Sequence, residues 1–314
     1  VVEDESEGIA LNSVLSKDFL KTVVRTRQDH IKCGISIFDS ITNGGFERDR
    51  VYLLSGKTGG GKSTVLLNIG YGMYKCGNGI LLPELNILKK MAESDNNIKI
   101  FENYCKANIE RLRQNDKDDK VHLILYVSLE NTDYETIKRY MCRMGFLTSI
   151  FWELIERDPI LKNCVNTDNG FKFTMENLPP NMDFKLKRRL IAISSFLEII
   201  NKYKRTEFKV IWKPAYSIST FDILAMIKKQ ERLGYIVDCV LVDYPDKMKP
   251  VNSDSRKSDQ SWDSLGKIID NLKALAKQCN IPVLGVSQIT RQGNKDSGNK
   301  NTILKIIVLI ELIA

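Results

Sequence analysis

Residues 56–63 constrain this chain more than any other segment, because they read Gly-Lys-Thr-Gly-Gly-Gly-Lys-Ser. This octapeptide fits the phosphate-loop pattern G-x-x-x-x-G-K-[ST]. An apolar run of strand character, residues 51–55, precedes it, and a helical pattern follows from residue 63 to about residue 77. Strand, glycine-rich loop and helix in this order favour a nucleotide-binding α/β fold over a glycine-rich turn that matches by accident.

The residue types in this segment suit the recognition of phosphate. Its glycines allow positive φ, which turns backbone N–H groups toward a bound anion. Lys62 can reach the β- and γ-phosphates, and the Ser63 hydroxyl can ligate Mg²⁺. The predicted nucleotide-binding residues are Gly56, Lys57, Thr58, Gly59, Gly60, Gly61, Lys62, Ser63 and Thr64.

The composition indicates the kind of partner and the redox compartment of the chain. The net charge of +8 favours a polyanionic partner, although a basic balance more often reflects only a solvated surface. The seven cysteines form no C-x-x-C pair, which argues against a disulfide or zinc framework and favours a reducing, cytoplasmic compartment. The apolar tail 303–314 is too short for a membrane span and is expected to form a buried strand.

The rest of the chain alternates between apolar runs and helical patterns. Strands are predicted at residues 51–55, 121–130, 208–212, 236–243 and 281–288, and helices at 63–77, within 131–206, and at 219–233 and 261–279. Apolar strands that do not alternate with polar residues are typical of a mostly parallel sheet covered by helices on both faces. A disordered start and an amphipathic helix at 13–29 are expected before this core, and a helical surface insertion at 83–120.

Polar side chains end three of the predicted strands, where α/β sheets bind their ligands. Asp243 ends an apolar strand and is expected to hold Mg²⁺ beside the phosphate loop. Glu130 could polarise the water that attacks a phosphate, or it could be a solvated cap of the helix that begins near Thr132. Gln288 could sense the terminal phosphate, or it could be an exposed loop residue.

Two basic loops follow these strand ends, at residues 246–260 and 291–300. Facing a channel they would contact a nucleic acid backbone, whereas on an open surface they would be solvated loops without the aromatic residues of a stacking platform. The candidate DNA-contacting residues are Lys247, Lys249, Arg256, Lys257, Arg291 and Lys295.

Four blocks, taken in order, resemble one known family. They are residues 33–46 leading into the phosphate loop, Ser-Leu-Glu at 128–130, Val-Leu-Val-Asp-Tyr at 240–244, and residues 272–277 continuing into 282–291. Together they are similar to the C-terminal motor domain of DnaB-like hexameric replicative helicases of the bacterial and phage type. The resemblance implies a RecA-like phosphate-loop core over residues 31–314, preceded by a disordered start and linker helix at residues 1–30.

The resemblance also implies roles for these residues. Lys62, Glu130 and Gln288 are expected to be catalytic, with Glu130 as the general base and Gln288 as the sensor of the γ-phosphate. Ser63 and Asp243 are expected to be the metal ligands. ATP and Mg²⁺ are the implied cofactors. The implied partners are single-stranded DNA, further copies of the chain in a hexamer, and a primase and helicase loader, in the cytoplasm of a bacterial or phage-infected cell and away from membranes.

This chain departs from the family at identifiable places. Pro245 and Asp246 stand where the bacterial proteins have apolar residues, residues 83–120 are extra, and the arginine finger is not identifiable after Arg291. The expected function is an ATP-dependent helicase motor that moves along single-stranded DNA and unwinds duplex during replication. The alternatives are a RecA-type strand-exchange ATPase and a nucleotide-binding helicase partner that does not unwind.

Overall fold

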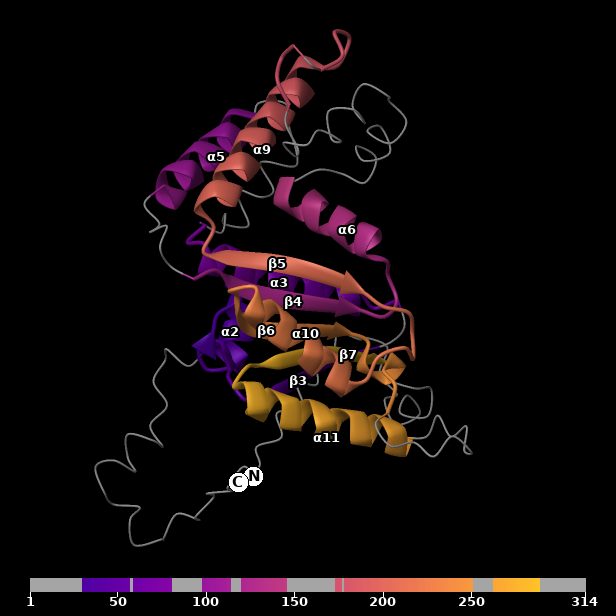
Figure 1. The fold of residues 1–314 in the computed structure, drawn as a ribbon. Coiled ribbons are helices and arrows are strands. Elements are labelled where there is room, and N and C mark those ends of the chain that lie inside the picture. The colour runs from indigo at the N-terminus through magenta and orange to yellow at the C-terminus, as the bar shows by residue number, and fades with distance from the viewer. Residues whose placement is uncertain are drawn as a thin grey trace, which may run out of the picture.

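A five-stranded parallel sheet forms the centre of the molecule (Figure 1). The computed structural model describes residues 30–56, 59–80, 98–113, 120–145, 173–176, 178–250 and 262–288. The strand order is β3-β7-β6-β4-β5, and every neighbouring pair is parallel. The strands are β3 (Val51–Gly56), β4 (His122–Ser128), β5 (Thr206–Trp212), β6 (Ile236–Asp243) and β7 (Val283–Gln288).

Helices cover both faces of this sheet, as Figure 1 shows with α3 on one face and α10 and α11 on the other. The helices are α2 (Ser36–Ile41), α3 (Lys62–Gly77), α5 (Ile98–Leu112), α6 (Asp133–Gly145), α9 (Phe184–Tyr203), α10 (Thr220–Arg232) and α11 (Trp262–Cys279). A short 3₁₀ helix, η4 (Pro245–Lys247), follows β6. A small antiparallel pair, β1 (His30–Ile31) and β2 (Phe46–Glu47), flanks α2. The predicted α/β architecture is confirmed.

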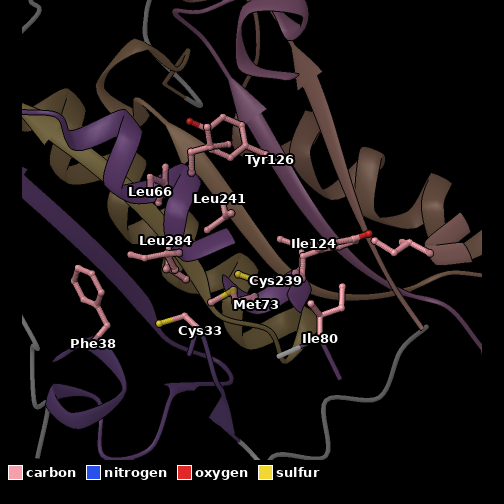
Figure 2. Close-up of a cluster of buried hydrophobic side chains, with 14 of the residues drawn as sticks. Cys33, Phe38, Leu66, Met73, Ile80, Ile124, Tyr126, Cys239, Leu241 and Leu284 are labelled. Atoms are coloured by element: carbon pink, nitrogen blue, oxygen red, sulfur yellow. The ribbon is translucent and has the colours of Figure 1, made fainter. Parts of the chain in front are cut away.

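The strand pleat divides the core into two hydrophobic clusters. Ile124 and Tyr126 of β4 point into the first cluster, where they meet Leu66 and Met73 of α3 (Figure 2). The intervening residues of β4 point to the opposite face and join the cluster formed with α10 and α11. Because successive strand side chains alternate between faces, an entirely apolar strand is what a sheet covered on both sides requires.

The described part of the predicted insertion is helical and packs against α9. Arg188 of α9 donates to both carboxylate oxygens of Glu102 on α5, with the Nε bond at 2.8 Å. Tyr104 of α5 meets the Phe196 ring of α9 edge to face, with 6.3 Å between the ring centroids. These two helices therefore form one helical layer beyond the β5 edge of the sheet (Figure 1). The insertion's outer limits, and the boundaries of the domains, stay predictions.

Other sequence expectations fall where the structure is not described. The helix predicted at residues 13–29 and the strand predicted at 303–314 both lie outside the described residues. Within the described helices, none is both long enough and apolar enough to cross a membrane.

Candidate functional site

The carboxyl ends of neighbouring strands bring the predicted site residues together. Gly56 at the end of β3 lies opposite Gln288 at the end of β7, and Ser128 at the end of β4 lies opposite Asp243 at the end of β6. The backbone N–H of Leu129 continues this ladder by donating to the Asp243 carbonyl at 2.7 Å. In a parallel sheet all carboxyl ends point to one edge, so the phosphate loop, Asp243 and Glu130 share that edge.

The phosphate loop has the backbone that its glycines predict. Gly59 and Gly61 have φ values of 75° and 73°, in the left-handed region that favours glycine. Gly61 is also the N-cap of α3, so the unpaired N–H groups of the first helical turn face the loop. Thr64 lies exposed in that turn, whereas Lys57 and Thr58 lie outside the described residues.

Lys62 folds back over the loop instead of extending into solvent. Its Nζ donates to the Gly56 carbonyl at 3.0 Å, and the residue is 7% exposed. Burial lowers the Lys62 pKa, and the negative charges of Asp246, Glu130 and Asp243 oppose that shift. The ammonium is therefore placed inside the loop, among three carboxylates, where an incoming phosphate could contact it.

Asp243 is fully buried and receives hydrogen bonds on both carboxylate oxygens. The Ser63 hydroxyl donates to Oδ1 at 2.9 Å and the Tyr126 hydroxyl donates to Oδ2 at 2.9 Å. Burial raises the Asp243 pKa, and the two hydroxyl donors act against that shift. Such donors offset much of the cost of holding a carboxylate away from water.

Ser63 and Asp243 suit a magnesium ion. Hydroxyl and carboxylate oxygens are the ligands that Mg²⁺ prefers, and this ion keeps several waters and needs only one or two protein ligands beside substrate phosphates. Among the described residues, no three His, Cys, Asp or Glu side chains gather as a self-sufficient metal site. One carboxylate and one hydroxyl beside a phosphate loop therefore suit an ion that takes its remaining ligands from water and phosphate.

Glu130 is not the cap of the following helix. That cap is made by Thr132 and Glu135, whose side chains each accept a hydrogen bond from the other's backbone N–H at 3.2 Å. Glu130 instead faces Lys247, with 3.4 Å between Oε1 and Nζ. The capping alternative is therefore wrong, and Glu130 belongs to the shared edge of the sheet.

Only part of the predicted DNA-contacting set lies among the described residues. Lys247 is in η4 and Lys249 follows it, its backbone N–H donating to the Ile218 carbonyl at 2.7 Å. Both therefore lie at the edge that holds Asp243. The remaining predicted contacts, Arg256, Lys257, Arg291 and Lys295, and the Gln288 side chain lie outside the described residues.

Two neighbours of the site are not predicted by the sequence pattern. Tyr126 belongs to an apolar strand by pattern, although a tyrosine inside such a strand commonly directs its hydroxyl to a polar partner. Asp246 has a buried Oδ1 without a hydrogen-bond partner, and burial raises its pKa, while Lys247 and Lys62 oppose this. The departure of Asp246 from the family pattern is the one signal that the sequence offers for it.

Comparison with known proteins agrees with this architecture. Residues 185–304 match the family model of the DnaB-like helicase C-terminal domain. The fold is similar to "The Structure Of A DnaB-Like Replicative Helicase And Its Interactions With Primase", with a TM-score of 0.55 and 17% identity over 95% of this chain and 54% of that one. It is likewise similar to a second solved structure, described as an ATPase domain, with a TM-score of 0.54 and 17% identity over 96% of this chain and 78% of that one.

The chain spans about half the length of the first of these two structures, and the family match covers β6 and β7 but not the phosphate loop. No curated protein sequence matches the chain. At 17% identity the two structures establish the fold, and the family match adds the sequence relation. The predicted resemblance to the C-terminal motor domain of DnaB-like helicases is thereby confirmed.

Proposed function

We propose that this chain is the ATP-hydrolysing motor of a replicative DNA helicase. The observation that carries the proposal is the 2.9 Å hydrogen bond between Ser63, the last residue of the phosphate loop, and the buried Asp243. These residues are 180 positions apart, yet they meet where a phosphate loop needs its metal ligands. A glycine-rich turn without nucleotide function has no need for a buried carboxylate at this place.

Each residue of the site has its own role in the proposed hydrolysis. Lys62 and the N–H groups at the start of α3 bind the phosphates, and Ser63 and Asp243 are the residues that hold Mg²⁺. When bound, this ion neutralises negative charge on the β- and γ-phosphates. Glu130 orients the attacking water and accepts its proton, and Gln288 senses the γ-phosphate from the end of β7.

The proposed assembly is the one that the resemblance to DnaB-like helicases implies. The motor forms a hexameric ring, a neighbouring copy supplies an arginine to the site, and the basic residues after β6 and β7 contact single-stranded DNA. A primase and a helicase loader are the proposed protein partners, in the cytoplasm of a bacterial or phage-infected cell. The primase proposal is supported by the name of the first similar structure, which describes a replicative helicase and its interactions with primase.

Substitution of Lys62 and Glu130 tests the hydrolytic site. Lys62→Ala is expected to lower ATP turnover by about a hundredfold or more, because it removes a charge aimed at the phosphates. Glu130→Gln is expected to bind ATP but to lose about 10²- to 10⁴-fold in turnover, the usual contribution of a general base. Lys228→Ala is the matched control, since that lysine lies on α10 with 54% of its side chain exposed. Full turnover in Lys62→Ala would refute the proposed site.

The helicase step needs its own assay. The wild-type protein is incubated with ATP and a forked DNA duplex that carries one labelled strand, and particles are imaged by electron microscopy. Release of the labelled strand together with closed rings supports a helicase. Open filaments that pair homologous strands, with no release from the fork, would instead identify a strand-exchange ATPase.

A further inference from the structure

The proposed general base forms an ion pair with a lysine of the neighbouring strand's loop. Glu130 lies just beyond β4 and Lys247 in η4 beyond β6, with 3.4 Å between Oε1 and Nζ. The Glu130 side chain is 41% exposed and the Lys247 side chain is 29% exposed, so both can still reach water or a ligand. The ammonium draws the Glu130 carboxylate toward η4 and competes with water for the Oε1 position.

The backbone around Lys247 is firmly held, which leaves the side chain as the part that can change partners. Its N–H donates to the Tyr244 carbonyl at 3.0 Å, and its own carbonyl accepts from the Tyr216 N–H at 2.6 Å. The Nζ lies 5.5 Å from the centroid of the Tyr244 ring. A lysine side chain has a flexible four-carbon stem, so its tip can turn from Glu130 to another anion without moving η4.

We propose that Lys247 is a positioning residue that restrains Glu130 until single-stranded DNA draws the ammonium away. This inference rests on the proposed function, because it needs Glu130 as the base and DNA at this edge. A DNA backbone carries closely spaced phosphates and offers a lysine more negative charge than one carboxylate does. Lys249, exposed two residues further on, adds a second cation to the same edge.

The pair is half exposed, so its influence is expected to be modest. Exposed lysine–carboxylate pairs are typically favoured by a factor of about two to five over the separated state. The restraint therefore predicts a low but measurable ATPase rate without DNA, and stimulation when DNA binds. It also predicts that removal of the ammonium gives part of that stimulation in the absence of DNA.

The experiment measures ATP turnover without DNA and with increasing amounts of an oligo-dT strand. Lys247→Met keeps the aliphatic stem and removes the charge, and is expected to raise the DNA-free rate about two- to fivefold. The stimulation at saturating DNA should fall by the same factor. Lys247→Arg, which can still pair with Glu130, is expected to return both values to those of the wild type. Lys228→Met is the control, because it breaks a Lys–Glu pair of 2.8 Å on α10.

The outcomes separate this inference from the proposed function. A wild-type protein that hydrolyses ATP and responds to DNA, but whose Lys247→Met variant keeps a low DNA-free rate and full stimulation, overturns the restraint alone. A variant that only needs more oligo-dT for half-maximal stimulation also overturns it, because Lys247 is then a simple DNA contact. A wild-type protein that hydrolyses no ATP under any condition overturns both.

Discussion

Lys75 offers a direct test of how a buried amine at the contact between α3 and α5 affects the stability of the fold. It lies on α3 with 3% of its surface exposed, and its Nζ is 4.3 Å from the Tyr71 ring centroid and 5.8 Å from that of Tyr104 on α5. The Tyr104 hydroxyl lies 3.4 Å from Nζ. Burial lowers the Lys75 pKa from 10.5 to about 8, so the charged form is the one that folding disfavours.

The sign of the pH dependence follows from these two pKa values. Between about pH 8 and 10.5 the unfolded chain keeps the Lys75 proton while the folded chain releases it. Because the unfolded state then binds more protons, the contribution of Lys75 to the free energy of unfolding rises with pH across this window. The gap of about 2.5 pH units corresponds to about 3 kcal/mol, or about 1.4 kcal/mol for each pH unit.

The assay compares the wild type with Lys75→Met by urea denaturation at pH 7, 8, 9 and 10. The other ionisable groups are present in both proteins, so their contributions largely cancel in the difference, apart from that of Cys76, whose charge acts on Lys75. That difference should be flat below pH 8 and then move in favour of the wild type as pH rises. Lys228→Met, at an exposed site, should give a flat difference throughout. Parallel curves for wild type and Lys75→Met from pH 8 to 10 would refute the reasoning.

Two further substitutions test contacts that position the site. Tyr126→Phe removes one of the two hydroxyl donors to the buried Asp243 and is expected to cost about 1.5–3 kcal/mol in the free energy of unfolding, measured with urea. An unchanged midpoint would mean that water replaces the hydroxyl. Gly72→Ala places a Cβ 1.8 Å from the Cys33 carbonyl oxygen, so α3 must shift and a loss of about 1–3 kcal/mol is expected despite alanine's higher helix propensity. A raised melting temperature would contradict the observed close approach.

Local pattern was sufficient for the five strands of the parallel sheet and their layer arrangement, but it did not predict the short pair of β1 and β2. The strand expected at residues 236–243 has those bounds in the structure, and the helix expected at 219–233 spans Thr220–Arg232. The strand expected from residue 208 begins at Thr206, whose backbone pairs with β4. Thr206 and Glu207 look polar in sequence, and only the neighbouring strand supplies the hydrogen bonds that extend β5 to them. The local sequence therefore predicts whether a segment is a helix or a strand, whereas the residues at which a strand begins and ends depend on the strands that pair with it.

The sequence likewise predicts some features of the candidate site and not others. The phosphate loop and Asp243 could be predicted because their chemistry depends on residue type and on position at a strand end. The pairing of Glu130 with Lys247 could not, because it depends on side chains from two strands that are adjacent in space and 117 residues apart. The partnerless oxygen of Asp246 is a property of packing that no spacing in the sequence encodes.

The buried Asp243 links the stability of the fold to the organisation of the site. An ionised carboxylate with no exposed surface is costly unless donors meet it, and here both donors are hydroxyls from separate elements, Ser63 of α3 and Tyr126 of β4. The same bonds that offset this cost fix the first turn of α3 to β6 and β4. The phosphate loop is therefore held in place before any ligand binds. This reduces the ordering that nucleotide binding must supply, which is the physical meaning of a preorganised site.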